Sequence, residues 1–365
     1  MQLLRTRRAT TVGVALAATA LLAAACSSSS TTSSAPSGSS TSGGSSSNLS
    51  GTLNGSGSTF QLTFQEAAIA AFKSVQSGMT VNYGGGGSGK GRTDLSSGVV
   101  SFAGSDSPVP STEASNFTGK TVLYFPVVIG PITLSYNLTG LSKPLQLSAP
   151  VIANIFQGKI TTWNNSAIAA DNPGVKLPST AITLAVRSDS SGTTANFSLF
   201  LMTAEPSVWT LGSSSTINWP KTARAGNGNG GVAQIVKSTP GAIGYVDYAD
   251  AKASGLSFAS VKNSSGNYIA PSVSSATAAA SGVTVAPNLT FHAVWAPGAQ
   301  AYPITYQSWD LVIQKQSSAN TTKMLKAYIG YLLGAGQQLL PSLNYAPLPA
   351  NIDSMAKAQL SKIGS

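Results

Sequence analysis

The feature that most constrains the fold is a regular alternation of strand-like and helix-like segments after about residue 50. The strand-like segments are β-rich and end in small polar residues, whereas the helix-like segments have apolar residues at helical spacing. The strand-like ranges are 79–85, 121–137 and 304–315, together with 99–106, a strand running into a polar turn, and 241–251, a strand and a turn. The helix-like ranges are 66–75, 89–98, 148–159, 230–239 and 321–340, and 181–204 reads as strand, loop and helix. This alternation predicts an α/β fold with mainly parallel sheets, in which ligands bind beyond the carboxyl ends of the strands and beside helix N-termini.

The first 25 residues have the pattern of a secretory signal. Arg5, Arg7 and Arg8 precede an apolar run that is too short to span a membrane and ends in small residues. The run stops at Cys26, the only cysteine of the chain, at the place of the lipid-modified cysteine of bacterial lipoproteins. Ala23 stands where such signals usually have leucine, so an ordinary secretory signal with an incidental cysteine is the alternative.

Residues 26–50 are predicted to form a tether between that cysteine and the folded part. The stretch after Cys26 is almost wholly Ser, Thr and Gly, a composition that buries no apolar surface. The remaining residues of this 365-residue chain suffice for two domains of ordinary size. A single cysteine excludes an intramolecular disulfide, so an ordinary hydrophobic core must hold the fold together.

Composition excludes several classes of function. The chain carries one histidine, His292, which lies among apolar residues and is expected to be structural. A histidine-rich metal site is therefore impossible, and a Ser-His-Asp triad would need His292 as its base. The formal charge of +10 includes the three leader arginines, and no basic stripe of a nucleic-acid binder is present. We expect no catalysis, no cofactor, no metal and no nucleic-acid partner.

The stretch "GGGGSGKGRTD" at residues 84–94 has the glycine and lysine spacing of a nucleotide-binding P-loop. Gly91 stands where that motif needs Ser or Thr to hold Mg²⁺, and an extracytoplasmic protein has no dependable ATP supply. The nucleotide hypothesis is therefore rejected. A glycine-rich turn that opens a helix still presents free backbone N–H groups to an anion.

Three strand-to-helix loops carry hydroxyl-bearing residues at the predicted start of a helix. These residues are Ser58, Thr59 and Phe60 in the first loop, Ser88 in the second, and Ser191, Gly192 and Thr193 in the third. Arg187 at the third loop adds a planar fork that fits a tetrahedral oxyanion. Each loop alone is explained by ordinary helix capping, because Ser and Thr are common N-caps. Together with Arg187, the three loops predict an oxyanion site.

Asp106, in "SFAGSDSPV", refines this prediction. A carboxylate beside a bound anion repels it unless the anion carries a proton to donate. Phosphate carries one or two protons near neutral pH and sulfate carries none, so Asp106 would select phosphate over sulfate. The alternative is that Asp106 merely caps a turn.

At these residues the sequence resembles the phosphate-binding protein of bacterial phosphate ABC transporters, the PstS family. The resemblance runs in family order from about Gly55 to Pro349. The matching stretches are "GSGSTF", "VNYGGGGSGKG", "SFAGSDSPV", "FPVVIGPITLSYN", "IFQGKITTWNNSAIAADNPGVKLP", "RSDSSGTTANF", "STINWP", "GNGNGGVAQIV", "PGAIGYVDYA" and "YPITYQSW". "SSGTT" alone would be common, but the ordered set is specific.

The resemblance implies roles for individual residues. The implied phosphate contacts are Thr59, Phe60 through its backbone N–H, Ser88, Asp106 as proton acceptor, Arg187, Ser191, Gly192 and Thr193. Asp189 matches the acidic residue that lies beside the arginine and tempers its charge. Lys90 replaces a small residue and is either a second cation at the mouth of the site or a solvated side chain outside it. Segment 259–300 does not align, which leaves the shape of that surface open.

The resemblance also implies a two-lobed periplasmic-binding-protein fold of type II, with the ligand in the cleft between the lobes. Residues 51–127 plus 304–365 would form lobe 1 and residues 128–303 lobe 2. Two hinge crossings are expected near 126–130 and 302–305, and the lobes would close around the ligand.

The implied function is an extracytoplasmic, lipid-anchored monomer that binds inorganic phosphate and delivers it to an ABC permease with its cytoplasmic ATPase. One rival is a secreted hydrolase that uses Ser191 or Thr193 as nucleophile, against which stand the missing base and metal ligands. The other is a surface adhesion or signalling protein that kept the fold and lost its ligand, against which stands the intact set of Asp106, Arg187 and Ser191.

Overall fold

The structure, a computed structural model, describes residues 49–364. The predicted signal (1–25), Cys26 and nearly all of the predicted tether lie outside this range. Within it, no helix has the length and apolar character needed to cross a membrane. The described residues belong to one compact unit of the chain, Ser47–Ser365.

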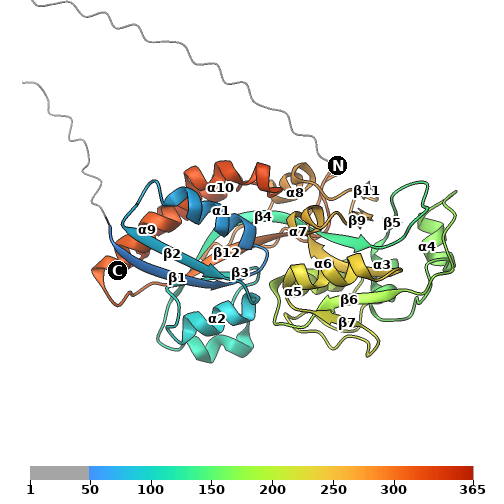
Figure 1. The fold of residues 1–365 in the computed structure, drawn as a ribbon, viewed down its shortest axis with the longest axis horizontal. Coiled ribbons are helices and arrows are strands. Elements are labelled where there is room, and N and C mark those ends of the chain that lie inside the picture. The colour runs from blue at the N-terminus through green and yellow to red at the C-terminus, as the bar shows by residue number, and fades with distance from the viewer. Residues whose placement is uncertain (1–48, 365) are drawn as a thin grey trace, which may run out of the picture. The chain divides into compact units, whose positions relative to one another are not determined.

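Strands and helices alternate along most of the described chain, as the sequence predicted (Figure 1). The strands are β1 (Gly51–Gly57), β2 (Met79–Gly84), β3 (Phe102–Ser105), β4 (Val122–Tyr136), β5 (Gln146–Leu147), β6 (Thr183–Arg187), β7 (Arg224–Gly226), β8 (Ala242–Asp247), β9 (Ser257–Phe258), β10 (Ser260–Lys262), β11 (Tyr268–Ile269) and β12 (Thr305–Ile313). The α-helices are α1 (Leu62–Phe72), α2 (Ser88–Ser96), α3 (Ala149–Phe156), α4 (Ser166–Asp171), α5 (Gly192–Ala204), α6 (Gly228–Ser238), α7 (Tyr248–Ala253), α8 (Val273–Ala280), α9 (Ala319–Leu333) and α10 (Ala350–Gln359). Four 3₁₀ segments are Ser111–Phe117, Ala335–Leu339, Pro341–Leu343 and Leu360–Lys362.

A nine-stranded sheet runs through the described residues in the order β2-β1-β3-β12-β4-β8-β6-β7, with β9 beside β4. The pairs β1–β2, β1–β3, β6–β7 and β6–β8 are parallel. The central pairs β3–β12, β12–β4 and β4–β8 are antiparallel. The prediction of mainly parallel sheets is therefore right for the flanks and wrong for the centre, because strand composition does not encode strand direction.

The long strand β4 is shared by the two halves of the sheet. Its first part, residues 122–131, pairs with β12, and its last part, residues 132–136, pairs with β8. The register of β4 against β12 shifts between Ser308 and Trp309, opposite Pro126, whose nitrogen cannot donate to a ladder. The exchange of partner and this irregularity lie within or beside the two segments expected to join the lobes.

Helices cover both faces of the half-sheet formed by β1, β2 and β3. Figure 1 shows α1, α9 and α10 above these strands and α2 below them. Their apolar faces are buried: Phe64 and Phe72 of α1 and Leu325 and Ile329 of α9 are almost fully covered. In the other half, α3 and α5 pack together, with Phe156 and Phe197 in edge contact at 4.7 Å between ring centroids. Burial of large side chains on both sides fixes the strand ends on which the site is built.

Several predicted boundaries moved. The long helix expected over 321–340 ends at Leu333, because Gly334 leaves the helical region of backbone space and a 3₁₀ segment follows. Over 241–251, where a strand and a turn are predicted, the strand ends at Asp247 and the short helix α7 replaces the turn, capped by the Asp247 side chain, which accepts from the Asp250 N–H. The segment 259–300, which the resemblance did not cover, contains β10, β11, α8 and turns.

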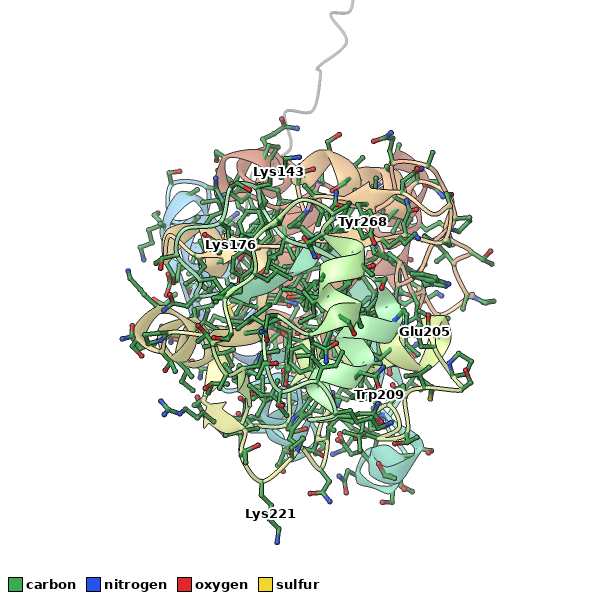
Figure 2. All side chains as sticks on the ribbon, turned by 90° about the vertical axis from the view of Figure 1, so that its right-hand side faces the viewer. Lys143, Lys176, Glu205, Trp209, Lys221 and Tyr268 are labelled. Atoms are coloured by element: carbon green, nitrogen blue, oxygen red, sulfur yellow. The ribbon has the colours of Figure 1, made fainter. Side chains whose placement is uncertain are left out.

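Exposed lysines are spread over the half that contains α3 and α4. Figure 2 shows Lys143 and Lys176 near one edge of this face and Lys221 projecting at another. Tyr268 of β11 lies on the same face and donates to Asp171 Oδ1 at 2.6 Å. The positive charge on this face is thus dispersed over several elements.

Candidate functional site

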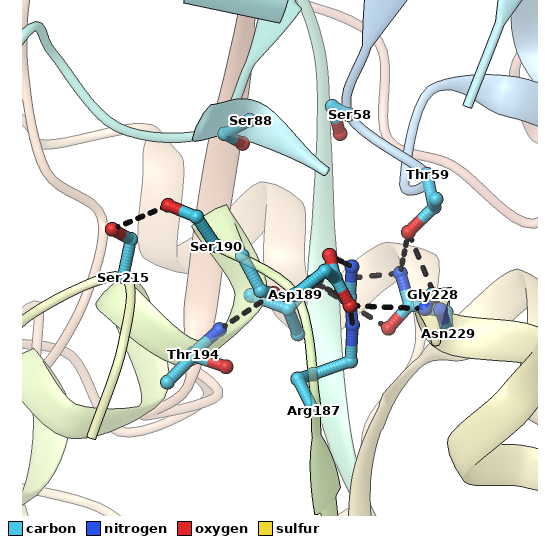
Figure 3. A network of polar contacts seen from close by, with 12 residues as sticks. Ser58, Thr59, Ser88, Arg187, Asp189, Ser190, Thr194, Ser215, Gly228 and Asn229 are labelled. Atoms are coloured by element: carbon cyan, nitrogen blue, oxygen red, sulfur yellow. Dashed lines mark hydrogen bonds and ion pairs between the residues drawn. The ribbon is translucent and has the colours of Figure 1, made fainter. Parts of the chain in front are cut away.

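The three predicted hydroxyl-rich loops converge at the ends of β1, β2 and β6. Ser58 and Thr59 follow β1, Ser88 is the first residue of α2, and Ser191 is the N-cap of α5. Figure 3 shows Ser58, Thr59 and Ser88 facing Arg187 and Asp189 from the opposite side. The loop after β7, which opens α6, brings Gly228 and Asn229 to the same place. Four strand-to-helix connections therefore meet in one region.

Asp106, just after β3, is buried at the centre of this region, with 1% of its surface exposed. Its Oδ1 accepts hydrogen bonds from Ser58 Oγ and Ser308 Oγ, both at 2.5 Å. Its Oδ2 lies 3.4 Å from Ser88 Oγ, and its backbone N–H donates to the same hydroxyl at 3.1 Å. Among residues 49–364, the Asp106 carboxylate is thus held by hydroxyl groups and forms no salt bridge to a cation.

The environment of Asp106 raises its pKa above the ordinary value. Burial is the largest cause, and the hydrogen bonds from Ser308 and Ser58 and the charge of Arg187 act against it. A carboxylate in this position gains from a ligand that donates a proton to it, because such a bond compensates part of the burial cost.

Arg187, the last residue of β6, is also buried and is paired with Asp189. Its Nε donates to Asp189 Oδ1 at 2.8 Å and its second terminal nitrogen to Oδ2 at 2.5 Å. Burial acts to raise the pKa of Asp189, but the hydrogen bonds and charge of Arg187 outweigh it and leave the pKa below its usual value. The pair fixes the guanidinium plane at the site and offsets part of its charge, as the resemblance implied for Asp189.

The other nitrogen of the Arg187 fork points toward Thr193, whose Oγ1 lies 3.3 Å away. Thr193 also contacts the side chain of Asn229 at 3.4 Å, and Asn229 Nδ2 donates to Thr59 Oγ1 at 3.2 Å. Phe60 is fully buried, and its N–H lies 3.1 Å from Ser58 Oγ. Hydroxyl, amide and guanidinium groups thus surround a single region from both halves of the sheet.

Glycines let the loops approach one another this closely. A Cβ on Gly192, at the start of α5, would lie 2.3 Å from Ser88 Oγ and 2.6 Å from Asp106 Oδ2. Gly87, the N-cap of α2, has a φ of +92°, and a Cβ there would lie 2.2 Å from Asp189 Oδ2. A side chain at either position would push the two groups of loops apart.

The arrangement is suited to hold a small anion that carries a proton. The starts of α2 and α5 offer N–H groups, Arg187 offers positive charge, and Asp106 offers an acceptor. Every predicted contact residue lies in or next to this region: Thr59, Phe60, Ser88, Asp106, Arg187, Ser191, Gly192 and Thr193. Within residues 49–364, no group of three or more His, Cys, Asp and Glu side chains could hold a metal ion.

Comparison with known proteins agrees with this geometry. A family model described as a PBP superfamily domain matches residues 33–335. Phosphate-binding protein PstS 3 of Mycobacterium leprae (strain TN) is 36% identical over 315 residues, which cover 83% of this chain and 84% of that protein. The chain belongs to the PstS family.

More distant relatives support the assignment. Phosphate-binding protein PstS of Xylella fastidiosa (strain Temecula1 / ATCC 700964) is 33% identical over 311 residues, or 84% of each chain. The structure of a phosphate-binding protein from Stenotrophomonas maltophilia aligns with a TM-score of 0.67 at 20% identity, over 84% of this chain and 93% of that one. The predicted resemblance and the two-lobed binding-protein architecture are confirmed by these similarities.

Two residues of this PstS-family chain whose placement the sequence left open can now be located. Lys90 is half exposed and forms an ion pair with Asp94 at 2.5 Å, one turn further along α2. His292 is exposed and borders a groove of about 520 Å³ that is also lined by Glu113 and Asn196. His292 therefore lies at the surface of the described part, beside a groove whose lining also includes Ser107 and Ser190, the chain neighbours of Asp106 and Asp189.

Sequence reasoning missed three residues that shape the site. Asn229 bridges Thr59 and Thr193, and Ser308 of β12 donates to Asp106. Arg92 of α2 pairs with Glu113 at 2.6 Å and donates to the hydroxyls of Ser105 and Ser107, the two neighbours of Asp106. Asn229 stands at a glycine-rich helix start, "GNGNGG", which could have been read like the other three loops. No local signal marked Ser308 or Arg92.

Proposed function

We propose that this protein binds inorganic phosphate at the convergence of the β1, β2, β3 and β6 strand ends. One observation carries the proposal: the buried carboxylate of Asp106 lies beside the starts of α2 and α5, in the same region as the guanidinium of Arg187. A site for a fully deprotonated anion would gain nothing from such a carboxylate. A protonated tetrahedral anion satisfies both groups, because it accepts from Arg187 and donates to Asp106.

The expected affinity follows from the number of charge-assisted bonds. Each contributes about 1.5–3 kcal/mol, and the two or three bonds that involve Arg187 and Asp106 are supported by N–H groups at the helix starts. After the cost of ordering the site, a dissociation constant of about one micromolar or tighter is reasonable. The relatives from Mycobacterium leprae and Xylella fastidiosa are named phosphate-binding proteins, which supports the choice of ligand.

We propose that binding closes two lobes, residues 51–127 plus 304–365 and residues 128–303. Thr59, Phe60, Ser88 and Asp106 would belong to the first lobe, and Arg187 and Ser191–Thr193 to the second. Several hydrogen bonds already join the two sets, among them Gly89 N–H to Ser190 O at 2.9 Å and Asn196 Nδ2 to Asp106 O at 2.7 Å. The exchange of partners along β4 supports hinges near residues 126–130 and 302–305.

The same proposal includes the location of the protein, its membrane anchor and its transport partner. The protein would act outside the cytoplasm as a monomer, held at the membrane through Cys26, and would hand phosphate to an ABC permease with its cytoplasmic ATPase. Only the closed form reports occupancy, so the permease would recognise that form. Replacement of Cys26 with serine should release the protein from the membrane fraction of expressing cells. Retention of that variant on membranes would refute the anchor and leave the phosphate site untouched.

A hydrolytic role finds no support at the candidate nucleophiles. Ser191 Oγ accepts from the Thr194 N–H and caps α5, and Thr193 Oγ1 contacts Arg187 and Asn229. Among the hydrogen bonds of the described residues, neither hydroxyl meets a carboxylate or an imidazole that could serve as its base. Members of the PstS family are binding proteins, and this chain is not an enzyme.

Calorimetric titration tests the proposed ligand. The protein is freed of bound anion and titrated at neutral pH with phosphate and then, separately, with sulfate. Tight phosphate binding without sulfate heat is expected, because only phosphate can donate to Asp106. Equal binding of both anions would refute the role of Asp106, and binding of neither would refute the phosphate site.

A further inference from the structure

The two oxygens of the Asp106 carboxylate have different surroundings. Oδ1 accepts two short hydrogen bonds, from Ser58 Oγ and Ser308 Oγ, both at 2.5 Å. Oδ2 has one long contact, with Ser88 Oγ at 3.4 Å. A Cβ on Gly192 would lie 2.6 Å from Oδ2, so this oxygen faces the start of α5. Oδ1 is therefore occupied by the protein itself, and Oδ2 keeps its capacity to accept a proton from a ligand.

The donor at Ser308 is oriented by a chain of side-chain amides behind it. Gln61 Nε2 donates to Ser308 Oγ at 2.7 Å and to the Trp309 carbonyl at 2.9 Å. Gln61 Oε1 in turn accepts from Gln65 Nε2 at 2.9 Å, and Gln65 Oε1 accepts from the hydroxyl of Tyr328 at 2.6 Å. These partners fix which end of each amide donates, so the Ser308 hydroxyl receives a proton from Gln61 and directs its own to Asp106.

We infer that Ser308, oriented by Gln61, is a specificity-determining positioning residue: with Ser58 it saturates Oδ1 of Asp106, so that Oδ2 alone receives the ligand's proton and the carboxylate stays ionised. The inference rests on the proposed function, because it assigns the proton-accepting atom of the same phosphate site. Ser308 lies 202 residues from Asp106 in the chain and was not among the residues that the family resemblance implied as contacts.

The consequence for anion selection follows from the sign of each influence on Asp106. Burial raises its pKa, and the Ser308 hydrogen bond is the first of the influences that lower it. Loss of that hydroxyl raises the pKa further. A protonated Asp106 can donate a hydrogen bond, and an unprotonated anion such as sulfate can accept it. Sulfate binding should therefore appear as pH falls, and at a higher pH without the Ser308 hydroxyl than with it.

The other ionisable groups around Asp106 are shared by all the forms that are compared below. Arg187 of β6 is the cation whose charge acts on it. Tyr83 of β2, Tyr306 of β12 and Tyr345, which precedes α10, interact with it electrostatically, and burial raises the pKa of all three, so they remain neutral. Asp310 of β12, which accepts from Gln65 behind Gln61, also changes charge in this range, because burial raises its pKa to about 7. A difference between Ser308→Ala and the wild type therefore reports the hydroxyl at Asp106, and sulfate has no proton of its own to lose there.

Four forms of the protein test the inference by calorimetry with phosphate and with sulfate, from about pH 8 to about pH 5. They are the wild type, Ser308→Ala, Ser308→Thr and Thr133→Val. Thr133 is a matched control outside the proposed hinges, because its buried hydroxyl on β4 donates to the Val246 carbonyl at 2.9 Å. Ser308→Ala should lower the preference for phosphate over sulfate by about tenfold, with a larger loss at the acidic end.

Ser308→Thr, which keeps the hydroxyl, and Thr133→Val should retain the wild-type preference and its pH profile. An unchanged preference and pH profile in Ser308→Ala, with wild-type selection of phosphate, would overturn this inference and leave the proposed function standing. Failure of the wild type to bind either anion would overturn both. Should Ser308→Ala fail to fold by circular dichroism, Ser308→Cys supplies the test, because a thiol is a weak donor of similar size and should shift the preference in the same direction.

Discussion

The site has a carboxylate side, formed by Asp106 with Ser58 and Ser308, and a guanidinium side, formed by Arg187 with Asp189. The protein treats the charges of the two sides differently. Arg187 is matched by a protein carboxylate, Asp189, through bonds of 2.8 and 2.5 Å, so its charge is partly offset by the protein. Asp106 is surrounded by neutral hydroxyls, so its charge is solvated by the protein without being cancelled. On the proposed function, the guanidinium side would supply attraction for a small anion in general, whereas the carboxylate side would decide which anion is accepted.

The pKa shifts show the same contrast. The pKa of Asp189 is lowered because Arg187 outweighs burial, and the pKa of Asp106 is raised because burial outweighs the hydroxyls. Asp189 remains an ion under all ordinary conditions, but Asp106 is poised to exchange a proton with its surroundings. Affinity and selectivity should therefore be separable by mutation.

The largest expected effect is on the guanidinium side. Arg187→Ala removes the fork that pairs with the anion and should weaken phosphate binding by about a hundredfold to ten-thousandfold, beyond calorimetric detection. Arg187→Lys keeps the charge but lacks the planar fork, so its phosphate affinity should fall between those of the wild type and Arg187→Ala. Because Asp189 loses its partner in Arg187→Ala, thermal unfolding of each variant should be measured to separate a loss of stability from a loss of binding. Unchanged phosphate affinity in Arg187→Ala would refute the site.

A substitution on the carboxylate side should change selectivity more than affinity. In Asp106→Asn, the donors Ser58 and Ser308 hold the amide oxygen and turn the amide N–H₂ toward the ligand. Sulfate affinity should rise and the preference for phosphate should fall by at least about tenfold, because the acceptor has become a donor. Competition of sulfate against bound phosphate measures this preference. If sulfate is still rejected, proton acceptance by Asp106 is not the basis of selection.

A second buried acid behind the carboxylate side should set the pH dependence of stability. Burial raises the pKa of Asp310 to about 7, against hydrogen bonds from Gln65 and Gln61. Because this value exceeds that of the unfolded chain, the folded state binds the proton more tightly. The tighter proton binding adds up to about 4 kcal/mol to the free energy of unfolding. This stabilisation is complete below about pH 4 and is lost as the pH rises through about 7.

Asp310→Asn should remove that pH dependence, which denaturant unfolding at several pH values measures. Asp353→Asn is the control, since that carboxylate forms an ion pair with Lys357 at 2.6 Å on α10. Parallel stability curves for wild type and Asp310→Asn would show that Asp310 ionises freely in the folded protein.

The smallest expected effect concerns Lys90. Its ion pair with Asp94 is half exposed, and such pairs contribute about 0–1 kcal/mol. Lys90→Ala should change the phosphate dissociation constant by less than about threefold, with the change reduced further by salt. A loss of more than about tenfold would show that Lys90 reaches the anion and that a second cation acts at the site.

The sequence predicted those parts of the site that carry a local signal. The loops at Ser58–Phe60, at Ser88 and at Ser191–Thr193 combine glycine and hydroxyl residues at a strand-to-helix transition, a pattern with a direct physical meaning. Arg187 and Asp106 stood out because charged residues make up only 9% of the chain.

The parts that escaped prediction depend on long-range pairing. Ser308 meets Asp106 across 202 residues and Asn229 meets Thr59 across 170, and neither position differs locally from an ordinary polar residue. The antiparallel centre of the sheet escaped for a similar reason. The strand β4 is apolar over most of its length, and β12 is buried although it carries Gln307, Ser308 and Asp310, so neither sequence indicates a strand direction.

The order of strands has a consequence for the making of the protein. The strand β12 lies between β3 and β4, although some 170 residues separate it from β4 and some 200 from β3 in the chain. While the chain emerges from amino to carboxyl end, β3 and β4 have no partner between them until residues 305–313 arrive. The first half can be completed only after almost the whole chain is available, so its exposed strand edges need protection from aggregation during that interval.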